Sequence, residues 1–200
     1  MESDDGVWGH AIAPVTLVVF TDLQCPFCAQ GHAAVRELQR RFGSAQLRVV
    51  VKHVPLSAHA GAIPAARVAQ AVLELGGPTK FFEYLERAFE RQELVAKGSA
   101  LELALPLGIE QTALAARAGS AEIGKQVLND AMLADRLGIA ALPHFRVNGR
   151  PFTGVHPVST LAAAIEMEHL AVQRLRNAGV PAEQVYSRRV DQNLNLPEPE

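Results

Sequence analysis

Residues 15–28 read VTLVVFTDLQCPFC, and this stretch decides the fold. Its first six residues are rich in β-branched side chains, which is typical of a buried strand. Cys25 and Cys28 follow after a short turn, and from residue 29 to residue 42 the pattern becomes helical. The sequence therefore predicts a strand that leads directly into a Cys-Pro-Phe-Cys motif at the start of a helix.

The start of a helix is a position that makes a cysteine reactive. The unpaired backbone N–H groups and the dipole at a helix N-terminus favour an anion, and the thiolate is the reactive form of cysteine. Cys25 is therefore the predicted nucleophile. Cys28 lies one turn further on and is predicted to be the more buried sulfur, which resolves a mixed disulfide formed on Cys25. Pro26 suits the first helical turn because no N–H donor is needed there.

The chain holds no other cysteine. A structural disulfide framework uses more cysteines at wider spacing, and a zinc site needs about four ligands. The pair therefore indicates redox chemistry first. The alternative from another class is a metal-binding module without exchange activity, in which His32, four residues after Cys28, supplies a third ligand.

The rest of the chain predicts a sheet interrupted by helices. Residues 47–51 form a second strand, and residues 145–148 and 151–153 form a hairpin around Asn148-Gly149, a strong turn signal. Five alanine- and leucine-rich segments between them read as helices. They span residues 60–75, 80–91, 99–105, 110–117 and 121–137. A terminal helix over 157–175 and a short helix over 182–188 complete the pattern.

These elements predict an inserted arrangement of domains. Residues 14–57 and 138–175 would form one α/β domain, and residues 58–137 would form a helical domain inserted into it. Residues 1–13 would be an N-terminal extension, loose up to Gly9. Residues 176–200 would be a C-terminal extension that is partly disordered from Leu194 onward because it is rich in proline and glutamate.

Composition excludes several classes of function. The 200 residues are 48% hydrophobic with a net charge of −2. The sequence has no basic patch of the kind that binds nucleic acid. The apolar stretch near the N-terminus is too short to span a bilayer, and the first residues lack the basic end of a signal peptide. The prediction is a cytosolic protein, a form whose export signal has been removed, or one domain of a longer chain.

Several separated motifs together resemble one known family. Residues 22–28, DLQCPFC, follow APVTLVVF at residues 13–20. KHVPL at residues 52–56 precedes His59 and an alanine-rich helix, and LGIAALP at residues 137–143 precedes FRVNG at residues 145–149. In this order they resemble the bacterial periplasmic disulfide oxidoreductases of the DsbA-like, thioredoxin-fold group. The resemblance covers roughly Pro14 to Leu170.

The resemblance implies a thioredoxin fold, with a mixed central sheet and a helical insertion, and a protein thiol–disulfide oxidoreductase. It implies a cis Leu142–Pro143 bond, with Pro143 beside the sulfurs and the preceding backbone free to pair with a bound peptide. It also implies a periplasmic or otherwise exported protein that acts on protein or peptide thiols and disulfides. The Cys25–Cys28 disulfide is then its own redox centre, without a dissociable cofactor. A redox partner of unknown identity resets it, and the short N-terminal extension predicts a monomer.

Two residues depart from the family pattern. Phe27 stands where the most strongly oxidising members carry a histidine, and phenylalanine can neither charge nor donate a hydrogen bond to the thiolate. The pair is therefore predicted to be less oxidising than in those members, which leaves a reductase or isomerase as the alternative to an oxidase. Leu142 replaces the threonine or valine of many relatives, so substrate choice can differ.

Two further side chains are candidates for supporting roles. Asp22, three residues before Cys25, could relay a proton to or from Cys28, or it could cap the turn before the helix. His144 follows Pro143, and a protonated histidine near Cys25 would support its thiolate. The alternative interpretation of His144 is an exposed strand position.

Overall fold

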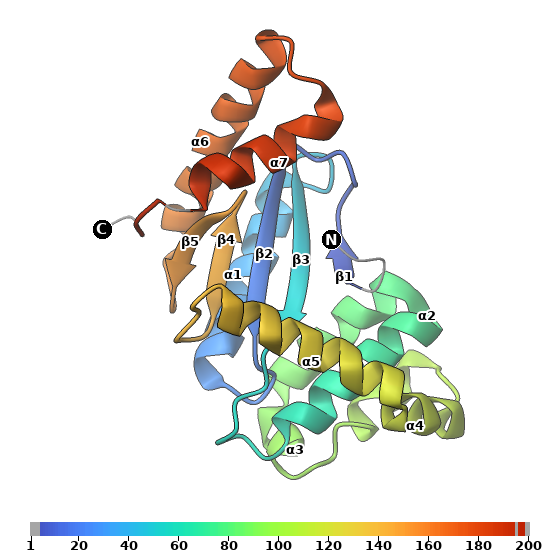
Figure 1. Cartoon of the computed structure of the whole chain (residues 1–200). Helices are drawn as coiled ribbons and strands as arrows, with labels where there is room; N and C mark the ends of the chain where they lie inside the picture. Colours follow the sequence, from blue (N-terminus) through green and yellow to red (C-terminus); the bar gives the residue numbers. More distant parts are fainter. Residues whose placement is uncertain (1–4, 195, 199–200) are drawn as a thin grey trace.

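The computed structural model describes residues 5–194 and 196–198 and has the predicted thioredoxin-type α/β architecture. Five strands form one mixed sheet in the order β1-β3-β2-β4-β5 (Figure 1). The strands are β1 Gly6–Trp8, β2 Val15–Thr21, β3 Leu47–His53, β4 His144–Val147 and β5 Arg150–Thr153. The helices are α1 Pro26–Phe42, α2 Ala62–Glu90, α3 Gln92–Ala96, the 3-10 helix η1 Glu102–Leu107, α4 Gln111–Gly119, α5 Ala121–Arg136, α6 Val158–Asn177 and α7 Ala182–Asn193.

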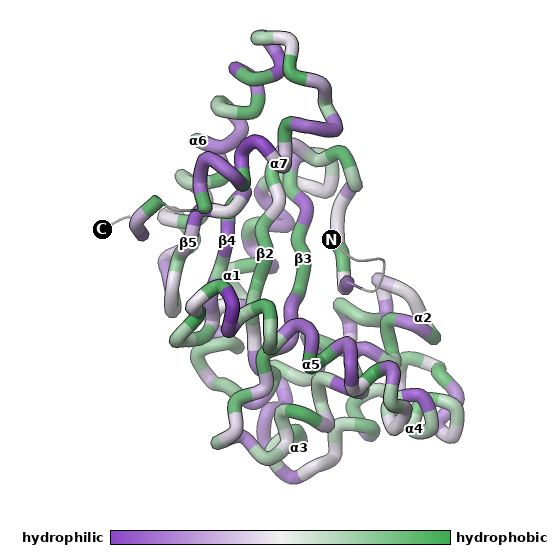
Figure 2. Tube along the Cα trace, viewed as in Figure 1, coloured by the Kyte–Doolittle hydropathy of each residue, from purple (hydrophilic) through white to green (hydrophobic). Residues whose placement is uncertain are grey.

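Strand β2 is the centre of the sheet. It pairs in parallel with β3 and antiparallel with β4, and α1 makes the crossover that a parallel pair requires. Because its side chains are buried on both faces of the sheet, β2 is hydrophobic along most of its length, as Figure 2 shows. The Cys-Pro-Phe-Cys segment therefore follows directly from the C-terminal end of the central strand at Thr21.

The two faces of the sheet are covered differently. Val19, Thr21 and Val51 share a surface with Val35 of α1, so these alternate side chains face α1. The intervening side chains, including Val18 and Phe20, project from the opposite face. There α5 crosses one end of the strands and α7 crosses the other, both in front of the sheet in Figure 1.

The helical segments between β3 and β4 pack around α2. This helix is broken at Gly77, where φ is 80°, so the two predicted helices over 60–75 and 80–91 form one kinked element. Phe81, Tyr84 and Leu85, in the part of α2 that follows the break, are fully buried. The predicted helix over 99–105 is instead the short 3-10 helix η1, because Pro106 interrupts α-helical hydrogen bonding there.

Both ends of the chain differ from the prediction. Gly6–Trp8, expected to be loose, forms strand β1 against β3, and a side chain at Gly6 would overlap the ring of Phe81. The short helix expected over 182–188 runs from Ala182 to Asn193 and packs on the sheet as α7. The predicted disorder of the last seven residues falls in part on residues 195 and 199–200, which lie outside the described residues.

Helix α7 is joined to the β4–β5 hairpin by a buried polar cluster. Asn148 and Gly149 both have positive φ, 43° and 93°, as the tight two-residue turn requires. The Asn148 side chain accepts from the Thr16 N–H at 2.8 Å and donates to Glu168 of α6 at 3.2 Å. Arg189 of α7 donates to both Glu168 carboxylate oxygens, at 2.9 and 2.6 Å. Asn193 donates to the Asn148 carbonyl at 3.0 Å.

Three histidines and one carboxyl group with shifted pKa values predict a pH-dependent stability. Burial lowers the pKa of His32, His53 and His144 to about 4, and burial raises the pKa of Asp130 to about 6. Between pH 6.5 and 4 these histidines are therefore protonated in the unfolded chain but stay neutral in the folded chain. The free energy of unfolding should therefore fall over this window, while protonation of Asp130 between pH 6 and 3.8 offsets part of the loss.

His53 offers the clearest test of this dependence. Its side chain is fully buried, and its ring lies against Phe81 with 5.9 Å between centroids. His53→Leu should remove at most about 3 kcal/mol of the loss between pH 6.5 and 4, as measured by urea unfolding across that range. The exposed His10→Gln serves as the control. An unchanged pH profile for His53→Leu would contradict the assignment.

Candidate functional site

The two cysteines lie where β2 gives way to α1. Cys25 is the N-cap of α1 with extended backbone angles, and Pro26 occupies the first helical turn. The Cys25 N–H donates to the Asp22 carbonyl at 3.1 Å, which closes the turn between strand and helix. Both cysteines are free thiols, with 4% of Cys25 and 1% of Cys28 exposed. The predicted order, with Cys28 the more buried sulfur, is what the structure shows.

Cys28 is held as a thiol by its surroundings. Burial raises the pKa of the Cys28 thiol to about 12, and the backbone N–H of Asp22, 3.4 Å from Cys28 Sγ, offsets part of this effect. The Thr21 hydroxyl favours the thiolate in the same way. Cys28 is therefore protonated at neutral pH in the dithiol, while the Asp22 N–H already points at the sulfur on which a negative charge would develop.

The Asp22 carboxylate is fully buried and tied to two segments. Its Oδ1 accepts from the Gln24 N–H at 2.7 Å, which makes it the turn cap that was one of the two predicted roles. Its Oδ2 accepts from the Leu56 N–H and lies 2.8 Å from His59 Nδ1. Asp22 therefore links the turn before Cys25 to the loop after β3. The proton-relay role stays a prediction.

Contacts from the segment between β3 and β4 also hold the cysteine loop, and the sequence analysis did not predict them. Gln92 at the start of α3 donates from Nε2 to the carbonyls of Leu23 and Cys25, at 3.0 and 2.9 Å. Gln24 Oε1 accepts from the Gly61 N–H at 2.8 Å. No motif surrounds Gln92, so only the folded chain reveals its role.

Pro143 meets α1 one turn after Cys28. The Leu142–Pro143 peptide bond is cis, as the resemblance implies. A Cβ atom at Gly31 would lie 2.8 Å from Pro143 Cγ, so the helix and the buried proline can approach this closely only because residue 31 is glycine. This close approach places the cis-proline segment beside the helix that carries both sulfurs. Gly31 is a further site residue that the sequence analysis did not single out.

The remaining predicted residues divide by exposure. Phe27 is 58% exposed, Pro26 is also exposed and Leu142 is half-buried, so these three can meet a substrate. His144 is buried rather than exposed, pairs in register with Phe20, and lies 2.9 Å through Nδ1 from Thr153 Oγ1. It projects from the sheet face opposite α1 and, with a pKa of about 4, is uncharged at neutral pH. His144 is therefore neither an exposed strand residue nor a charged group that supports the Cys25 thiolate, and both predictions for it were wrong.

The residues of the metal hypothesis do not assemble. His32 stacks on Phe89, with ring centroids 4.7 Å apart, and burial lowers its pKa to about 4. Among the described residues, no group of three histidine, cysteine or acidic side chains could hold a metal ion. The site as built offers two thiols, a buried carboxylate and an exposed aromatic side chain.

Comparison with known proteins gives the relatives of this chain. A family model described as thioredoxin matches residues 2–167. The chain is 36% identical over 180 residues to a protein of Salinispora tropica named Na(+)/H(+) antiporter NhaA 3, and 33% identical over 165 residues to Na(+)/H(+) antiporter NhaA 1 of Mycolicibacterium gilvum. These matches cover 88% and 81% of this chain but only 26% of each relative.

Solved structures share the fold. A thioredoxin-like oxidoreductase from Silicibacter pomeroyi superposes with a TM-score of 0.75 at 24% identity, over 84% of this chain and 94% of that chain. The thiol-disulfide exchange protein alpha-DsbA2 from Wolbachia pipientis gives a TM-score of 0.75 at 18% identity, over 83% of this chain and 88% of that chain. Both have the thioredoxin-like architecture described above.

The curated relatives contradict the predicted periplasmic or otherwise exported location. That prediction rested on exported disulfide oxidoreductases as relatives, whereas the matched proteins are named as antiporters, and the chain spans about a quarter of their length. Within the described part of the chain, no helix is both long and apolar enough to cross a membrane.

Proposed function

The chain belongs to the thioredoxin family, with a DsbA-like form of the fold, and from this premise we propose that it is a thiol–disulfide oxidoreductase. In this proposal Cys25 and Cys28 form the redox pair and exchange disulfides with protein substrates. The observation that carries it is the placement of Cys25 at the N-terminus of α1, with Cys28 buried one turn behind it. No dissociable cofactor is needed, because the pair itself stores two electrons.

In the oxidising direction, a substrate thiolate attacks Cys25 Sγ of the Cys25–Cys28 disulfide. The Cys25–Cys28 bond breaks, and Cys28 leaves as a thiolate that the Asp22 N–H stabilises until it takes up a proton. A second substrate thiolate then attacks the substrate sulfur of the mixed disulfide and releases the Cys25 thiolate. The substrate dithiol loses two electrons and the pair gains them.

In the reducing direction the same steps run backwards. The Cys25 thiolate attacks a substrate disulfide, and Cys28 must lose its proton before it can attack Cys25 and release the reduced substrate. The pKa of about 12 makes this resolving step the difficult one, and we propose Asp22 as the group that receives the proton. An isomerase would use the first attack alone and leave the mixed disulfide to rearrange.

Substrate recognition is assigned to the surface around Cys25. The exposed Phe27 ring and the half-buried Leu142 offer apolar contacts, and the backbone before Pro143 is proposed to pair with an extended peptide. The inserted segment 58–137 would act as a cap that holds the cysteine loop through Gln92 and Gly61. We propose a monomer that is reset by a separate redox partner.

Two assays of the purified chain test the proposal. The first follows reduction of insulin in the presence of dithiothreitol, and the second follows oxidation of a reduced dithiol peptide by the oxidised chain. Activity in at least one assay is expected, together with one disulfide per chain after oxidation. A chain that binds metal stoichiometrically and shows neither activity would support the metal-binding alternative instead.

The identity of residue 27 should set the direction of electron flow. Phe27 cannot stabilise the Cys25 thiolate by charge or by a hydrogen bond, so the reduction potential should lie well below the value of about −120 mV of a strong oxidant. Phe27→His should raise the potential, as measured by equilibrium with glutathione buffers. Phe27→Leu, which stays apolar, is the control. A parent potential near that of the strong oxidants would contradict this reasoning.

A further inference from the structure

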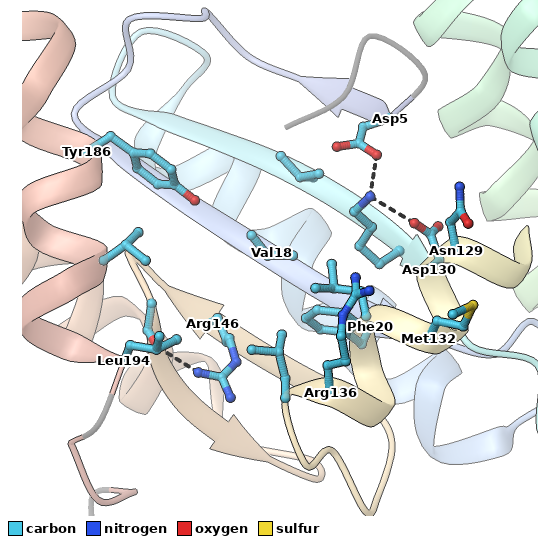
Figure 3. A pocket seen from close by; sticks show the side chains of 16 residues that line it. Asp5, Val18, Phe20, Asn129, Asp130, Met132, Arg136, Arg146, Tyr186 and Leu194 are labelled. Atoms are coloured by element: carbon cyan, nitrogen blue, oxygen red, sulfur yellow. Dashed lines mark hydrogen bonds and ion pairs between the residues drawn. The ribbon is translucent and has the colours of Figure 1, made fainter. Parts of the chain in front are cut away.

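A cleft of about 600 Å³ lies on the sheet face opposite the cysteines. Its floor is apolar and consists of Val18 and Phe20 of β2 and Val50 of β3. Leu133 of helix α5 and Leu137, which follows the end of α5, form one wall, and α7 forms the other (Figure 3). Because α5 and α7 cross only the two ends of the strands, the middle of this face is left for another occupant. The volume is typical of a site for a small molecule.

The charges at this cleft are not balanced within it. Lys52 is neutralised by two acidic partners, since its Nζ forms ion pairs with Asp5 and, at 2.8 Å, with Asp130. Arg136 of α5 and Arg146 of β4 also line the cleft, and neither forms an ion pair with any residue that the structure describes. Two guanidinium groups therefore lie beside an apolar floor without an ion pair among the described residues.

Arg146 is the more constrained of the two arginines. One of its terminal nitrogens donates to the Gly149 carbonyl at 3.1 Å. Its Nε is buried without a hydrogen-bond partner among the described residues, and burial lowers the pKa of the guanidinium. The exposed Glu198 favours the charge of Arg146 electrostatically but makes its hydrogen bond with Thr153. An unsatisfied donor of this kind costs free energy unless a ligand accepts from it.

We propose that this cleft binds a small amphipathic carboxylate, such as a fatty acid of medium chain length. The carboxylate would accept hydrogen bonds from Arg146 and Arg136, and the Tyr186 hydroxyl, directed into the cleft from α7 in Figure 3, would add a third donor. The alkyl chain would lie along Val18 and Phe20. A single negative charge fits best, because the charged side chains that line the cleft, two acidic and three basic, leave one positive charge over.

The test is calorimetric titration of the whole chain with dodecanoate below its micellar concentration. Saturable binding of one molecule per chain is expected. Arg146→Met should weaken it at least about tenfold, because a charged hydrogen bond is lost, whereas Arg174→Met on the exposed side of α6 should leave it unchanged. Circular dichroism and urea unfolding show whether each variant is folded. Arg136→Met, at an exposed position, provides the same test if Arg146→Met fails to fold.

Two further probes separate the contributions of charge and apolar surface. Acetate carries the charge without the chain and should not bind measurably, and dodecyltrimethylammonium carries the chain with the opposite charge and should bind much more weakly than dodecanoate. The proposal is overturned if dodecanoate shows no saturable binding, if the cationic probe binds equally well, or if neither arginine substitution weakens binding. Because the cleft lies on the other face of the sheet, none of these results depends on the exchange activity proposed for the cysteines.

Discussion

Cys25→Ser is expected to abolish thiol–disulfide exchange, with a loss of more than about 10³-fold in rate. A serine hydroxyl at the N-terminus of α1 stays protonated at neutral pH and cannot form a disulfide, so neither direction of the reaction has its first step. The fold should be unaffected, because Cys25 contributes its backbone rather than its sulfur to the turn that precedes the helix. Insulin reduction and dithiol-peptide oxidation provide the measurement.

Cys28→Ser is the matched control, since it differs from Cys25→Ser only in which sulfur is lost. Cys25 can still attack, but no resolving thiol is present, so a mixed disulfide with the substrate should accumulate. Mass spectrometry of the chain after reaction with a peptide disulfide should show one added peptide for Cys28→Ser and none for Cys25→Ser. The reverse pattern would show that Cys28, and not Cys25, is the nucleophile.

Glu168→Ala is expected to lower the free energy of unfolding by about 3–5 kcal/mol. Glu168 is 4% exposed and accepts hydrogen bonds from Asn148, Arg189 and Asn193. Its removal leaves a half-buried guanidinium without its carboxylate, takes one of two acceptors from each of two buried amides, and releases α7 from the β4–β5 turn. Urea unfolding of the reduced chain measures the loss.

Glu166 offers a control two residues away on the same helix. It forms an ion pair with Arg41 at 2.6 Å, but about half of each side chain is exposed. Glu166→Ala should therefore cost no more than about 1 kcal/mol. If Glu168→Ala were no more destabilising than Glu166→Ala, the buried cluster would not be what holds α7 in place.

The sheet could be predicted from local signals in the sequence. The apolar run at residues 15–20, the Asn148-Gly149 dipeptide and the Cys-Pro-Phe-Cys motif each depend on neighbouring residues, and each lies where it was expected. The cis Leu142–Pro143 bond was available only through the family resemblance, because most bonds before proline are trans. The order of burial of the two cysteines followed from helix geometry alone.

What the sequence could not predict depends on contacts between distant segments. Strand β1 is only three residues long, and its partner is β3. His59 reaches Asp22 across 37 positions, and Gln92 reaches Cys25 across 67. Side chains such as these look like ordinary surface or packing residues until the chain is folded. The assignment of His144 failed for a related reason, since the face from which it projects depends on its register with β2.

The order of the strands also has a consequence for biosynthesis. One edge of β2 pairs with β4, which is synthesised much later than β2. The contact between Thr16 and Asn148, for example, joins residues 132 positions apart. At ribosomal speeds of about 5–20 residues per second, roughly 7 to 26 seconds separate the synthesis of these two residues. For most of that interval the nascent chain carries both thiols without the strand that completes their surroundings, so they are open to oxidants and to other unfolded chains before the fold can bury them.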